Sequence, residues 1–194
     1  MNRIIKTGLL SVALLAAVVV QASNKIIVKA SESKKVEISL SEVASVETLI
    51  IKDVQNVILF KENIAVGETL EKTFDFSTIP TGLYFIEVRE EKRIEVTPVL
   101  ITEASATIVP NSSKKYKAPS ITLSDKVAKI FVNNFNEDVV RLILVSESGE
   151  ELFTKETKEL VSYSALNFSA LDEGDYTLYT TIDGHSFEDT ITIE

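Results

Sequence analysis

His185 is the only histidine in this chain of 194 residues, and the chain has no cysteine. Any catalysis that needs an imidazole, such as a Ser-His-Asp triad, must therefore use His185. The residue follows Asp183-Gly184, a dipeptide typical of a type I′ hairpin turn, where we expect a solvated side chain. The sequence contains no Gly-x-Ser-x-Gly nucleophile motif. We therefore predict a protein without enzyme activity. Burial of His185 among acids and hydroxyls in a deep cleft would contradict this prediction.

The same composition limits metal and cofactor sites. A zinc site draws on several His or Cys ligands, and the sequence offers one such residue. Calcium prefers oxygen ligands, and Asp172, Glu173 and Asp175 form an acidic group that could supply some of them. A second acidic group, within residues 183–189, lies more than roughly 20 Å away along the same predicted strand, so the two groups cannot share an ion. We predict no cofactor.

Residues 1–22 have the three parts of a secretory signal peptide. Arg3 and Lys6 precede an apolar run over residues 8–20, and Ala22 is a small residue at the expected cleavage position. As a helix this run would be about 20 Å long, shorter than the roughly 30 Å of hydrocarbon in a bilayer. We expect cleavage after Ala22 and an extracytoplasmic mature chain, in the periplasm, at the cell surface or secreted, without a membrane span.

The charge of the mature chain excludes some partners. Cleavage removes Arg3 and Lys6 and no acid, so the formal charge changes from −9 to −11. An acidic chain repels phosphate groups, so we expect neither nucleic acid nor an anionic membrane surface as a partner.

The two halves of the chain repeat each other. Residues 76–84 (FSTIPTGLY) match residues 168–176 (FSALDEGDY) at an offset of 92 positions. Residues 49–51 match residues 142–144 at an offset of 93, so one position is lost between the two blocks. A duplicated unit of about 85 residues has the size of a small sandwich domain rather than of a solenoid repeat.

Each repeat is predicted to contain seven short strands, because apolar and polar residues alternate in runs of five to nine. The predicted strands are 25–30, 34–40, 46–52, 57–61, 70–76, 83–89 and 93–99 in the first repeat, and 119–123, 126–133, 138–146, 151–155, 161–168, 175–181 and 186–193 in the second. This pattern predicts an all-β protein with two tandem immunoglobulin-like, seven-stranded Greek-key β-sandwiches.

The predicted domains are residues 23–109 and 120–194. Residues 110–119 between them are polar and bounded by prolines, which is typical of a linker. Lys114, Lys115 and Lys117 form a basic cluster there, and we expect these side chains to be solvated.

Two Gly-x-Tyr elements occupy equivalent places in the repeats. In Greek-key sandwiches a Tyr near the start of the sixth strand hydrogen-bonds back to the preceding corner. A buried phenol needs such a partner to avoid a desolvation cost. We therefore predict a structural role for Gly82, Tyr84, Gly174 and Tyr176.

Residues 74–88 (FDFSTIPTGLYFIEV) resemble the C-terminal sorting domains of type IX secretion cargo in the Bacteroidetes. Those domains are small sandwiches with a similar Leu-Pro-x-Gly-x-Tyr corner. The resemblance implies a secreted or envelope protein of such a bacterium, built from two sorting-domain-like modules and without a catalytic role.

A possible contact face follows from the strand pattern. If the third and sixth strands of the second repeat are neighbours, Ile143, Val145 and Tyr179 point outward together. The first repeat has a weaker version of this face with Ile50 and Phe85. Such positions predict docking, either between the two units or onto another envelope or secreted protein. Scattered surface hydrophobic residues are an equally compatible alternative.

The sequence leaves open an accessory module that binds carbohydrate or calcium. Sugar binding on an aromatic platform needs neighbouring rings. The expected outward tyrosines, Tyr163 and Tyr179, fall on opposite sheets of the predicted sandwich. The sequence therefore predicts that an aromatic platform for sugar binding is not formed.

Overall fold

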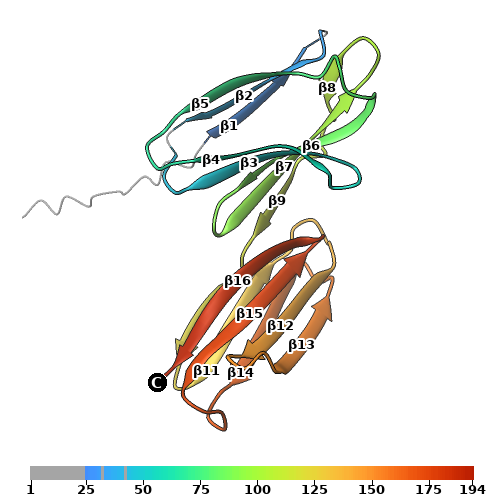
Figure 1. Ribbon diagram of the computed structural model, residues 1–194. Helices are drawn as coiled ribbons and strands as arrows, with labels where there is room; N and C mark the ends of the chain where they lie inside the picture. The colour runs from blue at the N-terminus through green and yellow to red at the C-terminus, as the bar shows by residue number, and fades with distance from the viewer. Residues whose placement is uncertain (1–24, 32, 42) are drawn as a thin grey trace, which may run out of the picture.

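The computed structural model describes residues 25–31, 33–41 and 43–194. The predicted signal peptide, residues 1–22, lies outside the described residues. Every helix or strand in the described part of the chain is a β-strand, arranged in two units stacked end to end (Figure 1). The predicted all-β, immunoglobulin-like sandwich fold is therefore confirmed.

The first unit contains a three-stranded sheet packed against a larger one. Its strands are β1 (Lys25–Ala30), β2 (Lys35–Ser41), β3 (Glu47–Asp53), β4 (Ile58–Ile64), β5 (Leu70–Asp75), β6 (Gly82–Arg89), β7 (Arg93–Ile101), β8 (Ala106–Ile108) and β9 (Lys114–Lys117). The smaller sheet has the order β1-β2-β5, and the larger has the order β4-β3-β6-β7-β8, with β9 also paired to β7.

The second unit repeats this arrangement with fewer strands. They are β10 (Ser120–Ser124), β11 (Val127–Asn133), β12 (Val140–Ser146), β13 (Glu151–Thr157), β14 (Val161–Asn167), β15 (Gly174–Ile182) and β16 (His185–Ile193). The two sheets have the orders β10-β11-β14 and β13-β12-β15-β16. Consecutive strands such as β13 and β14 change sheets, as in a Greek-key sandwich.

Alternation along the strands places the core. In β2, Val36, Ile38 and Leu40 are buried. Lys35, which precedes them, and Glu37, which lies between the first two, are exposed. A period of two puts one row of side chains between the sheets and the other in solvent. The same alternation holds in both units. One buried apolar cluster lies within the first unit, and the other fills the second unit and includes Ile94, Val96 and Tyr116 of the first.

The structure adds two strands that the sequence pattern does not predict. β8 and β9 are only three and four residues long, and both pair with the outer edge of β7. Pro98, which has no N–H to donate, lies between the two paired segments of that edge. β9 lies inside the predicted linker. Part of this segment is therefore sheet rather than solvated chain. The local sequence does not predict this strand, because its pairing partner, β7, is distant in sequence.

Both tyrosines of the Gly-x-Tyr elements hydrogen-bond back to the preceding corner. The Tyr84 hydroxyl donates to the Pro80 carbonyl at 2.8 Å, and the Tyr176 hydroxyl donates to the Asp172 carbonyl at 2.7 Å. Each ring also packs edge-on against a buried phenylalanine, Phe76 or Phe168 respectively. The duplicated corner thus closes the two sandwiches by the same contact.

We expect Tyr84→Phe and Tyr176→Phe each to lower the free energy of unfolding by about 1 kcal/mol, because each leaves a corner carbonyl without its hydroxyl donor. Urea denaturation of the mature chain measures this loss. Tyr179→Phe is the matched control, because Tyr179 is 40% exposed. Equal midpoints for all three variants would contradict a stabilising role of the corner bonds.

Candidate functional site

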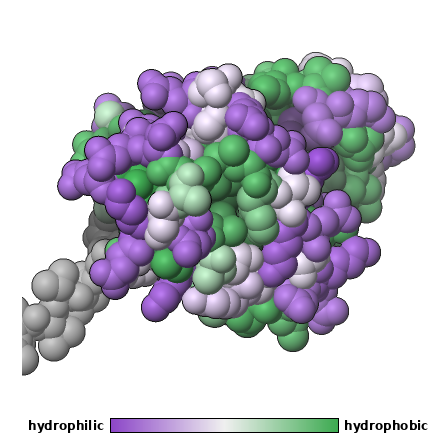
Figure 2. Space-filling model, turned by 90° about the horizontal axis from the view of Figure 1, so that it is seen from below, coloured by the Kyte–Doolittle hydropathy of each residue, from purple (hydrophilic) through white to green (hydrophobic). Residues whose placement is uncertain are grey.

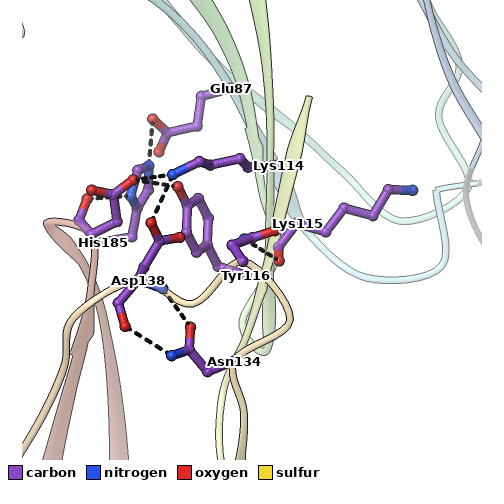
Figure 3. A network of polar contacts seen from close by, with 9 residues as sticks. Glu87, Lys114, Lys115, Tyr116, Asn134, Asp138 and His185 are labelled. Carbon is purple, nitrogen blue, oxygen red and sulfur yellow. Dashed lines mark hydrogen bonds and ion pairs between the residues drawn. The ribbon is translucent and has the colours of Figure 1, made fainter. Parts of the chain in front are cut away.

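The strongest cluster of polar contacts lies where the two units meet. We call it the inter-unit joint and define it as Glu87 on β6, Lys114 and Tyr116 on β9, Asp138 in the β11–β12 loop, and Asp183 and His185 at the β15–β16 hairpin (Figure 3). The hairpin brings Asp183 and His185 to the end of the second unit that faces the first (Figure 1). β9 supplies its side chains from the edge of β7.

Glu87 is a fully buried carboxylate on the outer face of the larger first-unit sheet. Its side chain is 0% exposed and pairs with Lys52 at 2.7 Å and with Arg89. Burial raises the pKa of Glu87. The contacts with His185, Lys52 and Arg89 outweigh that effect and lower its pKa from the usual 4.5 to about 2. Glu87 is therefore a buried anion held by three cationic or potentially cationic groups.

His185 is buried, contrary to the expectation of a solvated imidazole. It is 8% exposed, and its Nε2 lies 3.5 Å from Glu87 Oε2. Its ring stacks on Tyr116, with centroids 4.4 Å apart. Nδ1 lies 3.1 Å from the carbonyl oxygen of Asp183. The expectation was wrong because the first unit covers the hairpin, and the turn motif carries no information about that contact.

Lys114 and Tyr116 tie β9 to the second unit. Lys114 Nζ donates to Asp138 at 2.8 Å and to Asp183 at 2.9 Å, and the Tyr116 hydroxyl donates to Asp183 at 2.7 Å. Burial raises the pKa of Tyr116, and Asp183 raises it further. The hydrogen bonds from Lys114 and Tyr116 lower the pKa of Asp183. Lys114 is therefore not the solvated linker residue that its local sequence predicts.

Apolar contacts complete the inter-unit joint. Ile94, Val96 and Tyr116 of the first unit are buried in the same cluster as the core of the second unit, and Phe85 packs against it. Lys92 adds an ion pair with Asp189 at the rim. The two units are thus packed against each other.

This arrangement does not provide an activated nucleophile. A Ser-His-Asp triad needs a serine hydroxyl on the imidazole, whereas His185 Nε2 faces the carboxylate of Glu87. The ring of Tyr116 stacks on His185, and the Tyr116 hydroxyl is engaged with Asp183 and has a raised pKa. The His185 ring is held between units by its stacking on Tyr116 and its contact with Glu87.

Two hollows flank the hairpin at the inter-unit joint. One of about 350 Å³ is lined by Val54, Phe85, Pro98, Tyr116 and His185 among others. The other, of about 280 Å³, lies against Ile50, Glu87 and the same hairpin. The first lies at the lower end of the volume range of drug-sized ligand sites, and the second lies just below that range.

The acidic candidates for calcium lie at the opposite end of the second unit. Asp172, Glu173 and Asp175 line an open hollow with Glu147. Asp175 accepts a hydrogen bond from Thr192 at 2.7 Å. Within residues 25–31, 33–41 and 43–194, no group of three or more His, Cys, Asp or Glu residues is arranged to hold a metal ion.

The predicted contact residues divide between covered and exposed positions. Ile50 is 6% exposed, and Phe85 packs against the second unit. Ile143 lies directly opposite Tyr179 in the β12–β15 pair, and Val145 is two positions further along β12. Ile143 and Val145 are half-buried and Tyr179 is 40% exposed. The structure therefore brings the second-unit residues together on one outer face.

Comparison with known proteins places the first unit in a secretion context. Residues 31–103 match the family model described as "Secretion system C-terminal sorting domain". The first unit is similar to a secretion sorting domain. The matched segment contains β2 to β7 and the first tyrosine corner. Such a domain implies a secreted or cell-surface protein, and it suggests a non-enzymatic structural module.

Solved structures similar to the chain are distant. A "Biofilm associated protein - BSP domain" is 17% identical, with a TM-score of 0.31, over 86% of this chain and 29% of that one. The "Human OSCAR ligand-binding domain" is 10% identical, with a TM-score of 0.27, over 88% of this chain and 97% of that one. The chain thus spans less than a third of the first of these structures. No curated protein matches the chain.

A search of the described residues for a helix long and apolar enough to cross a membrane found none.

We expect Glu87→Gln to lower the free energy of unfolding by about 3 kcal/mol at neutral pH, because it leaves the largely buried Lys52 and the half-exposed Arg89 without their anion. Since folding lowers the pKa of Glu87, the stability it contributes is full above about pH 4.5 and is lost as the pH falls toward 2. The difference between wild type and variant should therefore shrink over that range in urea titrations.

Glu91→Gln is the control for this titration, because Glu91 is 83% exposed and makes one long ion pair, with Lys92. It should leave the stability almost unchanged at every pH. A Glu87→Gln penalty that stays constant from pH 6 to about pH 2 would show that the carboxylate charge is not what stabilises the inter-unit joint.

Proposed function

We propose that this protein is a secreted, non-enzymatic module that acts by binding another envelope or secreted protein. The binding surface is the outer face of the β13-β12-β15-β16 sheet around Ile143, Val145 and Tyr179, which we call the β12–β15 face. The inter-unit joint would hold this face at a fixed distance and angle from the first, sorting-domain-like unit.

The proposal rests on one observation: the same outer face is covered in the first unit and uncovered in the second. Ile50 lies opposite Glu87 in the β3–β6 pair, and Ile143 lies opposite Tyr179 in the β12–β15 pair. In the first unit this pair is almost fully buried, with His185 of the second unit against Glu87 and the β15–β16 hairpin across a hollow from Ile50. In the second unit the pair is exposed or half-buried. This outer face of the sandwich can therefore serve as a docking surface. The first unit already uses its version of the face to contact the second unit.

The residue types at the exposed face fit a protein partner. Tyr is enriched at protein interfaces because it combines a large apolar ring with a polar tip. Ile143 and Val145 flank the ring with branched aliphatic side chains that lose little freedom on binding. The molecule seen from the far end of the second unit shows hydrophobic patches between hydrophilic ones (Figure 2). The similarity of residues 31–103 to a secretion sorting domain supports an envelope or extracellular partner.

We expect Ile143→Lys combined with Tyr179→Lys to abolish capture of the partner from an envelope extract, because two charges would be buried in the complex. The partner is identified by mass spectrometry in the wild-type capture and then tested as a purified protein. Circular dichroism and the urea midpoint check that the variant is folded, since both positions face outward.

Tyr163→Ala is the matched control, because Tyr163 is also an exposed tyrosine but belongs to the opposite sheet. It should retain the purified partner with unchanged affinity. Undiminished binding by the Ile143 and Tyr179 double variant would rule out the β12–β15 face as the binding surface.

A further inference from the structure

The outer face of the β10-β11-β14 sheet carries an aromatic pair. Phe131 on β11 and Tyr163 on β14 are direct cross-strand neighbours, 38% and 56% exposed respectively. Val161, 48% exposed, points outward two positions from Tyr163 on β14. We call this surface the β11–β14 face. It lies on the opposite side of the sandwich from the β12–β15 face.

The duplicated unit shows that the fold does not require aromatic residues at these positions. Aligning the buried positions of β2 with β11, and of β5 with β14, places Ser39 where Phe131 is and Glu71 where Tyr163 is. In the first unit Ser39 and Glu71 are also direct cross-strand neighbours. The same sandwich thus forms with an ordinary polar pair, and the aromatic pair needs another explanation.

The β11–β14 face also differs in charge from the rest of this acidic protein. Among the described residues of its three strands, none that points outward is Asp or Glu. The outward residues are Ser120, Thr122, Ser124, Val127, Lys129, Phe131, Asn133, Val161, Tyr163, Ala165 and Asn167. The equivalent first-unit face carries Lys35, Glu37, Glu71 and Asp75. Lys129 is the one charged side chain in this set, and the aromatic rings are otherwise surrounded by hydroxyls and amides, which suit an uncharged, hydroxyl-rich ligand.

The size of this face argues against a second copy of the chain as its occupant. Three strands about 4.8 Å apart and about seven residues long give a surface of roughly 300 Å². A stable protein–protein interface needs about 800 Å² from each partner. The face is therefore long and narrow, which suits a linear chain, and a second copy of the chain would have to extend its contact beyond these three strands.

Lys155 argues against a partner that adds a strand at β14. Its Nζ donates to the Tyr163 carbonyl at 3.1 Å and to the Ser162 hydroxyl at 2.9 Å. A lysine at an open sheet edge blocks pairing with another chain. The same contact fixes the backbone of β14 at Tyr163.

We infer that the β11–β14 face is a binding site for a neutral polysaccharide. The rings of Phe131 and Tyr163 stack on the C–H faces of successive or neighbouring sugar rings. Ser120, Thr122 and Asn133 offer hydrogen bonds to the sugar hydroxyls beside them. This site goes beyond the protein partner proposed above and uses no residue of the β12–β15 face.

The test is an NMR titration of the mature chain labelled with ¹⁵N, using cellohexaose and laminarihexaose as neutral probes and hexagalacturonate as an anionic one. A neutral hexasaccharide should shift the amide signals of β11 and β14, with hexagalacturonate giving weaker shifts. Phe131→Ala and Tyr163→Ala should each weaken the apparent affinity by about tenfold or more, because each removes one stacking surface.

Two further variants separate stacking from other contacts. Tyr163→Leu keeps an apolar side chain but removes the ring, and it should lose binding as Tyr163→Ala does. Ile143→Lys with Tyr179→Lys should retain glycan binding in full, which distinguishes this site from the proposed protein contact. Urea midpoints check the fold of each variant, since Phe131 and Tyr163 face solvent.

Three results would overturn the inference. One is the absence of shifts in β11 and β14 with both neutral probes at millimolar concentration. Another is a Tyr163→Leu variant that binds as tightly as the wild type, which would indicate unspecific apolar contact. The third is a concentration-dependent dimer in sedimentation experiments that Tyr163→Ala abolishes, because a second copy would then cover the face.

Discussion

The relative placement of the two units depends on one buried anion. Glu87 lies on an outer sheet face, where an uncovered carboxylate would normally be hydrated, yet its side chain is inaccessible to solvent. Lys52 and Arg89 alone could neutralise it within the first unit. The His185 ring adds the contact that links it to the second unit. Movement of the hairpin away from Glu87 would leave this carboxylate with Lys52 and Arg89 and would open it to water on the side that His185 now covers.

The duplication gives an internal standard for deciding which residues serve the fold. Both units keep the tyrosine corner, with Tyr84 and Tyr176 bonded to the carbonyl four residues earlier. They differ at Glu87, which corresponds to Tyr179, and at Glu71, which corresponds to Tyr163. Residues shared by the units thus maintain the sandwich. Of those that differ, Glu87 contacts the neighbouring unit, whereas Tyr179 and Tyr163 are exposed and lie on the two faces for which we propose ligands.

Local pattern predicted the strands well, because alternation and turn residues act within a few positions. β1, β11 and β15 lie within one or two residues of their predicted ranges. β9 was missed because its Lys-Lys-Tyr-Lys sequence is that of a solvated segment, and only the distant edge of β7 makes it a strand. His185 was misplaced for the same reason. The outward position of Phe131 follows from alternation in β11, but its proximity to Tyr163 depends on the register between β11 and β14.

The geometry of the second unit separates its two candidate faces physically. β12 and β15 belong to one sheet, β11 and β14 to the other, and the buried core lies between them. A ligand on one face therefore cannot block the other by direct overlap. The inter-unit joint occupies the β15–β16 hairpin end of this unit (Figure 1). Both faces therefore lie on the sides of the second unit and are not covered by the first. A protein contact on one side and a glycan contact on the other would let such a module bridge a partner and a polysaccharide without any change in its fold.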